Sequence, residues 1–402
     1  MIPFSPPRID EKICNEVVAA LKSGWITTGP RTKLFEKKIT EYCGNKNTIC
    51  LNSATAGLEI MLRWFGVGEG DEVILPAYTY SATANVIVHC GAKPVFVDVN
   101  AHDFNIDVNA IESAITEFTK VIMPVDFGGM PCDYDEINSL VIKHRNLFTP
   151  DGDIQSKLGR ILVLSDSAHS FGATYNGKKT GSLTDVSVFS FHAVKNLSTA
   201  EGGAIALNLP QPFDNGEVYN DLCIKTLHGQ NKDALAKTQP GNWKYDIIEA
   251  GYKFNMTDIA AAMGLVELER YDSDTLIKRR HIVESYDRLL GGDPRIQIPL
   301  SSTVKKAGCC HLYPLRIVGI TESQRDAVIQ EIFREQVSVN VHFLPVPGMS
   351  FYRKLGYNPY DYTVAYDNYS REISLPVFYD LTDEQITVVV NAVFKALNKI
   401  LC

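Results

Sequence analysis

Long hydrophobic runs, closely paired cysteines and an excess of positive charge are all missing from this 402-residue sequence. No apolar run approaches about eighteen residues, so we expect no helix that spans a membrane. The formal net charge of −8 argues against nucleic acid or an anionic membrane as the main partner, although a local positive field can still bind an anionic nucleotide. Residues 1–12 lack a basic segment followed by an apolar run, so we also expect no signal peptide.

The nine cysteines form no CxxC motif and show no paired spacing. Even the adjacent Cys309 and Cys310 lack the spacing of zinc ligands, so we expect no bound metal. Scattered cysteines are most simply explained as buried thiols in a reducing compartment, which predicts a cytoplasmic protein. The hydrophobic content of 45% is typical of a globular protein, and the length predicts at least two domains.

Short apolar runs recur along the first half of the chain, with helical spacing between them. They predict strands at residues 48–51, 72–75, 94–98, 121–125, 161–164, 186–191 and 204–207. The helical spacing predicts helices at residues 9–23, 32–42 and 81–89, one that opens within 52–57 and continues to 64, and a long one from 257 or 258 towards 289. Repeated strand–helix–strand units predict an α/β fold with a mostly parallel sheet and helices on both of its faces.

The pattern changes from about Arg279 onward. It predicts strands at residues 313–318 and 338–343 and helices at residues 322–335 and 383–399. These elements indicate a smaller C-terminal α+β domain packed on the first. We therefore divide the chain into residues 1–255 and 256–402.

Three segments fall outside the predicted helices and strands. Residues 66–70 contain three glycines but precede a strand instead of following one, so they predict a turn and not a dinucleotide-binding loop. Residues 146–159 are polar and rich in turn residues, which predicts an exposed excursion. Residues 231–242 are polar and irregular, which predicts a mobile loop.

Two polar residues directly follow neighbouring predicted strands. Asp166 comes just after the run 161–164, and Lys195 follows the run 186–191. Ligands of α/β sheets bind at the carboxyl ends of the strands. Pyridoxal 5′-phosphate (PLP) needs a lysine that holds it covalently and a carboxylate that keeps its ring nitrogen protonated. From these residues alone, a helix-capping aspartate and a solvated lysine remain the more common explanation.

A second group of polar residues opens the helix after the first strand. Ser53 and Thr55 lie at a helix start, where unpaired N–H groups and the helix dipole favour an anion. Either hydroxyl also suits an ordinary helix cap, so the residues alone leave both interpretations open. If the fold places this helix start beside Lys195, the helix start can form half of a phosphate-binding site.

Longer motifs resemble a known enzyme family. The segments DSAHSFGATYNGKKTGS and FSFHAVKNLSTAEGGA resemble the fold-type-I, PLP-dependent sugar aminotransferases of the DegT/StrS type. Among these, the sequence looks most similar to the UDP-4-amino-4-deoxy-L-arabinose (UDP-4-keto-sugar) aminotransferases. The similarity runs from SGWITTGP near the start to ISLPVF near the end. It implies a seven-stranded, mostly parallel sheet in a large PLP-binding domain and a smaller C-terminal domain.

The resemblance implies a role for each matching residue. Lys195 holds the cofactor and moves the proton, Asp166 pairs with the ring nitrogen, and His169 contacts the ring hydroxyl. Further cofactor contacts are implied for Ser190, Thr55 and the amide of Ala56 at the phosphate, and for Tyr80 stacked on the ring. Substrate contacts are implied for Trp25, Thr27, His192 and His342.

The turn at residues 251–258 is expected to reach a partner subunit. In the family it crosses a dimer interface to the partner's cofactor phosphate, which implies a homodimer with shared active sites. Lys253 and Asn255 stand where many members carry Asn and Arg, so which of them makes this contact stays open. A solvated lysine and a helix-capping asparagine are the alternative explanation.

The implied reaction takes an amino group from L-glutamate, releases 2-oxoglutarate and aminates a nucleotide-linked keto sugar. A UDP-linked 4-keto sugar is favoured, which would give a 4-amino sugar for surface polysaccharide, lipopolysaccharide or other glycans. A 3-keto sugar linked to dTDP or GDP is the alternative. Lys195 argues against a dehydratase, which carries histidine there, and the missing DNA-binding domain argues against a non-catalytic PLP-binding regulator.

Overall fold

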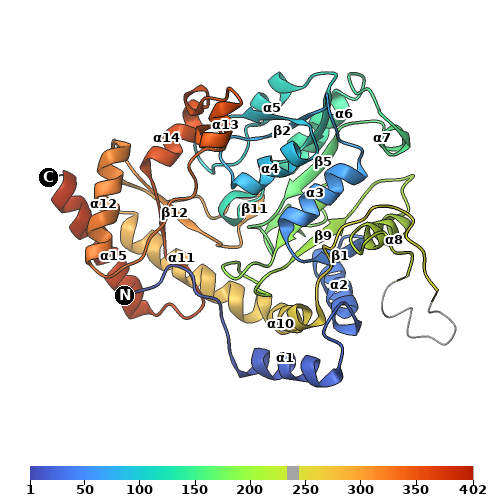
Figure 1. The fold of residues 1–402 in the computed structure, drawn as a ribbon. Helices are drawn as coiled ribbons and strands as arrows, with labels where there is room; N and C mark the ends of the chain where they lie inside the picture. The colour runs from blue at the N-terminus through green and yellow to red at the C-terminus, as the bar shows by residue number, and fades with distance from the viewer. Residues whose placement is uncertain (233–243, 402) are drawn as a thin grey trace.

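A seven-stranded sheet forms the centre of the protein, whose computed structural model describes residues 1–232 and 244–401 (Figure 1). Its strand order is β1-β9-β8-β5-β4-β2-β3. The strands are β1 Asn47–Leu51, β2 Glu72–Pro76, β3 Lys93–Val97, β4 Thr119–Ile122, β5 Leu162–Asp166, β8 Val186–Ser190 and β9 Gly203–Leu207. The loop predicted at residues 231–242 lies almost entirely outside the described residues.

All neighbours in this sheet are parallel except where β9 pairs, antiparallel, with β1 and β8. The strands are almost wholly buried on both faces, which explains why they read as continuous apolar runs. The seven strands predicted for the large domain, and their mostly parallel arrangement, are confirmed. Residues 66–70 form the predicted turn before β2, with positive φ angles at Gly66 and Gly70.

Helices cover the sheet on both faces, as predicted (Figure 1). Those of the first half of the chain are α1 Glu11–Ser23, α2 Pro30–Cys43, α3 Ala54–Trp64, α4 Ser81–His89, α5 Val108–Ala114, α6 Tyr134–Lys143, α7 Asp153–Leu158 and α8 Asn215–Lys225. Helices α3 and α4 pack on each other over one face, and α5 and α6 pack on each other over the opposite face. This packing leaves the carboxyl edge of the parallel strands open.

The predicted long helix after residue 257 consists of two helices joined by one wider turn. Helix α10 spans Asp258–Glu269 and α11 spans Leu276–Leu290, with a π-helical turn at Tyr271–Thr275 between them. The Thr257 side chain caps α10 by accepting from the Ala260 amide at 3.2 Å. Apolar spacing does not distinguish a π turn from an α turn, so the sequence predicted a single helix.

A second hydrophobic core lies under a small antiparallel sheet of strand order β10-β12-β13. The remaining helices and strands are β10 Ile296–Gln297, β12 Tyr313–Ile317, α12 Glu322–Arg334, α13 Ser350–Lys354, α14 Thr363–Arg371, β13 Glu372–Leu375 and α15 Asp383–Leu401. A third sheet joins the short strands β6 Thr174–Tyr175, β7 Lys178–Lys179 and β11 Lys306–Ala307. The division of the chain near residue 255 stays a prediction.

The prediction of a strand at residues 338–343 is wrong. Asn340 and Ser374 form one isolated bridge, in which each backbone N–H donates to the other's carbonyl. The pairing stops there because the His342 amide donates to the Glu372 carboxylate at 2.9 Å instead of to a backbone carbonyl. The neighbour of β12 at this edge is β13, which the sequence analysis did not predict.

The excursion at residues 146–159 is mostly exposed, as predicted, but it contains helix α7 and two buried anchors. Phe148 packs in the large core, and the Gln155 side chain donates to the Phe65 carbonyl at 3.0 Å. Every cysteine in the described part of the chain is a free thiol, but not all are buried as expected, because Cys14 is exposed and Cys90 and Cys223 are half-buried. None of the described helices is long and apolar enough to cross a lipid bilayer.

Tight packing between α10 and α2 gives a test of the fold. A Cβ atom added to Gly264 of α10 would lie 2.4 Å from Cζ of Phe35, a fully buried side chain of α2. We expect Gly264→Ala to lower the free energy of unfolding by about 1–3 kcal/mol, because an overpacked core must shift. Gly68→Ala is the matched control, since no atom lies within 4 Å of its added Cβ. Urea unfolding compares the two variants, and equal midpoints would contradict the packing.

Candidate active site

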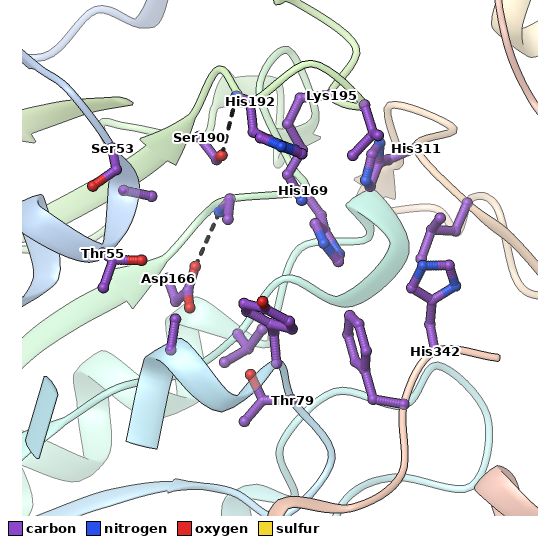
Figure 2. A pocket seen from close by; sticks show the side chains of 18 of the residues that line it. Ser53, Thr55, Thr79, Asp166, His169, Ser190, His192, Lys195, His311 and His342 are labelled. Carbon is purple, nitrogen blue, oxygen red and sulfur yellow. Dashed lines mark hydrogen bonds between the residues drawn. The ribbon is translucent and has the colours of Figure 1, made fainter. Parts of the chain in front are cut away.

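A cavity of about 560 Å³ opens at the carboxyl edge of the large sheet. Asp166 ends β5, Ser190 ends β8, and Thr79 and Tyr80 follow β2 at this edge. Figure 2 shows the hydroxyl residues Ser53 and Thr55 on one side of Asp166 and the histidines on the other. This is the position where α/β sheets bind their ligands.

The Asp166 carboxylate is buried at the floor of the cavity and held by two hydrogen bonds. Thr83 Oγ1 donates to its Oδ2 at 2.8 Å, and the Ala168 amide donates to its Oδ1 at 3.2 Å. Burial raises the pKa of Asp166, while these hydrogen bonds and the charge of Lys195 oppose the shift. Thr83 was missed by the sequence analysis, because nothing local links a residue in the first turn of α4 to the end of β5.

The Lys195 side chain is half-buried and lines the same cavity. Burial lowers the pKa of Lys195 to about 8, against the weaker opposing influence of Asp166. Lys195 lies in the connection between β8 and β9, and its amide donates to the His192 carbonyl at 2.8 Å. A lysine that loses its proton this readily is suited to act as a nucleophile and a base.

The start of α3 meets Ser190 and Gly203 at a corner of the cavity that suits an anion. Ser53, Ala54, Thr55 and Ser190 all line the cavity. A Cβ atom at Gly203 would lie 2.5 Å from the Ala54 nitrogen, so only glycine lets β9 approach the helix start this closely. The Ala56 amide, predicted as a phosphate donor, already donates to Ser53 Oγ at 3.1 Å. The amides that precede it have no intrahelical acceptor.

His169 faces the cavity as a neutral ring. The Gly128 amide donates to its Nδ1 at 3.3 Å, so the single proton of a neutral ring must sit on Nε2. Burial, together with the charges of Lys195 and His342, lowers the pKa of His169 well below its ordinary value. His169 can therefore donate from Nε2 without carrying a charge.

A second cavity histidine, His311, was missed by the sequence analysis. Its ring lies 4.4 Å from that of His169 between centroids, and Asn196 Oδ1 is 2.9 Å from its Nδ1. Asn196 also donates to the Cys309 carbonyl at 2.8 Å, so the residue beside Lys195 fixes the His311 segment. Burial lowers the pKa of His311 well below its ordinary value. The only local signal was a histidine after two cysteines, which matches no motif.

The structure brings most of the predicted residues together. The predicted residues that line the cavity are Lys195, Asp166, His169, Ser190, Thr55, Tyr80, His192 and His342. Those outside its lining are Ala56, Trp25, Thr27, Lys253 and Asn255. Their roles as cofactor and substrate contacts stay predictions.

The N-terminal arm also contributes to the cavity, which the sequence analysis did not predict. Phe4 and Ser5 line the cavity, and the Phe4 ring stacks on His342 with centroids 5.5 Å apart. A bridge between Ile2 and Val337 ties the arm to the second core. The prolines within residues 3–7 favour an extended backbone but give no sign of this contact, which joins residues more than 300 positions apart in the sequence.

The sequence profile of the DegT/DnrJ/EryC1/StrS aminotransferase family matches residues 7–394 of this chain. The chain belongs to this family. The structure of Spr1654 from Streptococcus pneumoniae in its PMP form covers 100% of both chains, with 46% identity and a TM-score of 0.96. The same protein was solved in a PLP form, with a TM-score of 0.95. These comparisons confirm the family, the fold class and the aminotransferase activity.

Two further relatives cover almost the whole aminotransferase. The spore coat polysaccharide biosynthesis protein SpsC of Bacillus subtilis is 35% identical over 398 residues, which are 98% of this chain and 96% of SpsC. The UDP-4-amino-4-deoxy-L-arabinose–oxoglutarate aminotransferase of Shewanella sediminis is 34% identical over 402 residues, 98% of this chain and 97% of that enzyme.

The site fits PLP, the cofactor of this family. The buried Asp166 carboxylate suits a pyridinium nitrogen, and Lys195 suits the cofactor's carbonyl carbon. The hydroxyl groups of Ser53 and Thr55 at the start of α3, and that of Ser190 at the end of β8, line a corner of the cavity that suits the phosphate. The close approach at Gly203 keeps side chains out of that corner.

The lowered pKa of Lys195 predicts how cofactor loading depends on pH. Only the neutral amine attacks a carbonyl, so attachment of added PLP to the apo-protein should speed up as pH rises through about 8 and then level off. Stopped-flow absorbance between about pH 7 and about pH 10 measures this rate. Lys195→Ala controls for non-covalent binding and should lack the absorbance change. A rate that keeps rising to the pKa of an ordinary lysine would show that Lys195 is not desolvated.

Proposed function

We propose that this aminotransferase works in the cytoplasm and moves an amino group from L-glutamate to a UDP-linked 4-keto sugar. Its product would be a 4-amino sugar for surface polysaccharide, lipopolysaccharide or other glycans. The observation that carries the reaction type is the half-buried Lys195, with a pKa of about 8, in one cavity with the buried Asp166. The names of SpsC and of the Shewanella enzyme support the sugar, the nucleotide and the 2-oxoglutarate product.

Each residue at the centre of the cavity has a distinct task. PLP, when bound, supplies an electron sink and carries the amino group from one substrate to the other. Lys195 Nζ, as a neutral amine, is suited to move the proton between the amine-bearing carbon of the substrate and the carbonyl carbon of the cofactor. Asp166 is held by Thr83 and the Ala168 amide, whose hydrogen bonds favour its charged form, and is suited to pair with the ring nitrogen. His169 Nε2–H is available as an uncharged donor to the ring hydroxyl.

A screen of nucleotide-linked keto sugars tests the substrate. Purified holoenzyme is mixed with L-glutamate and each of a UDP-4-keto, a dTDP-3-keto and a GDP-3-keto sugar, and products are identified by mass spectrometry. We expect an amino sugar from the UDP-4-keto compound and equimolar 2-oxoglutarate. Amination of a 3-keto sugar alone would replace the proposed substrate.

Two variants link the measured activity to the site. Lys195→Ala should abolish turnover, because no other lysine among the described residues lines the cavity and could supply the covalent link. Asp166→Asn should lower kcat by about 10²- to 10³-fold, the usual effect of losing one key electrostatic partner. Near-normal turnover in either variant would contradict the assigned roles.

We also propose that the active unit is a homodimer with shared sites. The four predicted contacts Trp25, Thr27, Lys253 and Asn255 lie outside this chain's own cavity. They sit on two loops packed together, where Asn255 Nδ2 donates to Thr28 Oγ1 at 2.7 Å and the Asp258 amide donates to the Thr27 carbonyl at 2.9 Å. Thr27 and Lys253 are exposed. These two packed loops form a two-loop unit that lies outside the cavity of its own chain. Its exposed side chains are therefore suited to contact the active site of a partner subunit.

Asp258 holds this two-loop unit rigid. Its carboxylate accepts from the Gly29 amide at 2.8 Å and from the Thr32 amide at 2.9 Å, so it caps α2 from the start of α10. The carboxylate is fully buried. The two loops therefore present their exposed side chains in a fixed arrangement.

Complementation between inactive subunits tests the shared site. One subunit carries Lys195→Ala, and the other carries Lys253→Ala with Asn255→Ala. Hybrids should regain activity, because one of their two sites combines an intact lysine with an intact partner loop. If every dimer is a hybrid, activity should approach about half that of wild type, because one of the two sites in each dimer is complete. Hybrids that form but stay inactive, with the loop variant inactive alone, would place the loop in its own subunit's site.

A further inference from the structure

A chain of three hydrogen-bonded side chains runs from the second core to the cavity. The Ser374 hydroxyl donates to Glu372 Oε1, and Ser374 Oγ lies 2.8 Å from His342 Nδ1. Glu372 and Ser374 are fully buried on β13, whereas the half-buried His342 lines the cavity (Figure 2). The sequence analysis singled out His342 but not the two residues behind it.

The direction of this chain decides which nitrogen of His342 carries the proton. A serine that donates its only proton to a carboxylate must accept from the next partner. His342 Nδ1 is then the donor, and a neutral ring leaves its other nitrogen, Nε2, without a proton. Burial lowers the pKa of His342 to about 3, aided by the charge of Lys195, so the ring is neutral at working pH. The cavity side of His342 is therefore a hydrogen-bond acceptor as long as Glu372 is ionised.

The surroundings of Glu372 act on its charge in opposite directions. Its Oε2 accepts from the His342 amide at 2.9 Å, so both carboxylate oxygens face donors. The buried guanidinium groups of Arg316 and Arg325 act on it electrostatically. Burial opposes them and raises the pKa of Glu372 to about 8. Below that pH a proton on Oε1 would reverse the donor and acceptor roles along the chain.

The backbone of His342 is fixed as well. Tyr78, fully buried behind the cavity, donates its hydroxyl to the His342 carbonyl. The Phe4 ring stacks on one side of the imidazole, and the Phe343 ring lies edge-on at 4.9 Å between centroids. The ring therefore has little freedom to turn Nε2 away from the cavity.

We propose that Glu372, as a carboxylate, and Ser374 are positioning residues that hold the proton of His342 on Nδ1, so that Nε2 accepts a hydrogen bond from a hydroxyl group of the keto-sugar substrate. The sugar part of this inference rests on the proposed function. A neutral acceptor offers nothing to the carboxylates of glutamate, which need donors. The same nitrogen suits a sugar hydroxyl, so the chain favours the sugar over the amino donor.

The test compares Ser374→Ala with the matched control Ser285→Ala, which removes a buried hydroxyl on α11 away from the cavity. Both are studied as holoenzyme at about pH 9, above the pKa of Glu372. The two half-reactions are followed separately by the absorbance of the bound cofactor. Ser374→Ala should lower kcat/KM for the keto sugar by about fivefold to twentyfold, chiefly through KM, and leave the glutamate half-reaction within about twofold. Ser285→Ala should change neither.

A direct measurement of the ring proton keeps the proposal independent of activity. Histidine ring ¹⁵N NMR of the labelled holoenzyme at about pH 9, where Glu372 is a carboxylate, assigned with His342→Gln, should show Nδ1–H and an unprotonated Nε2 in wild type. Ser374→Ala should shift the population towards Nε2–H. A wild-type ring protonated on Nε2 would overturn the proposal, as would equal losses in both half-reactions. If no keto sugar is a substrate, the proposed function fails, while the NMR result still decides whether the chain sets the proton of His342.

Discussion

Two opposite charges held away from bulk water, Asp166 and Lys195, set the requirements for everything around the cavity. Removing a charge from water is costly, so each partner must be compensated by neighbours. Thr83 and the Ala168 amide hold Asp166, and the sheet edge places Lys195 within electrostatic reach of it. The parallel strands satisfy this constraint because their carboxyl ends converge at one edge. The arrangement gives a buried acid whose charged form is favoured by its hydrogen bonds and by Lys195, and an amine that deprotonates easily.

Three neutral histidines complete the electrostatics of the cavity. The pKa values of His169, His311 and His342 are all lowered, mainly by burial. A positive charge on any of them would compete with Lys195 for Asp166. Because each ring is neutral, it carries one proton, and the hydrogen-bond partner of its Nδ1 decides which nitrogen holds that proton. The partners are, in the same order, Gly128, Asn196 and Ser374. The protein thus controls donors and acceptors in the cavity without adding charge.

The sequence predicted the large sheet well because its strands are buried on both faces and read as uninterrupted apolar runs. The same runs place Asp166 and Lys195 at the carboxyl edge of the sheet, whereas their cofactor roles were implied by the resemblance of the flanking motifs to the family. The contacts of Thr83, His311 and Phe4 could not, because they join residues that are distant in sequence and share no local pattern. The prediction of a strand at residues 338–343 was wrong because the His342 amide donates its hydrogen bond to the buried Glu372 side chain. A β-strand would need that amide to donate to the backbone of a neighbouring strand. Local patterns reveal the strands, whereas the residues that orient the site depend on tertiary contacts.

The antiparallel strand β9 has a consequence for the order in which the site assembles. Ser190 of β8 pairs with Gly203 of β9 across the connection that carries Lys195, whereas Leu51 of β1 pairs with the same glycine from far earlier in the chain. Closing a short loop costs less chain entropy than closing a long one, so the β8–β9 hairpin can form first. We expect the lysine loop to be shaped by local pairing before the phosphate corner exists. Binding of the cofactor phosphate also requires a long-range step, the docking of β1 and α3 onto this hairpin.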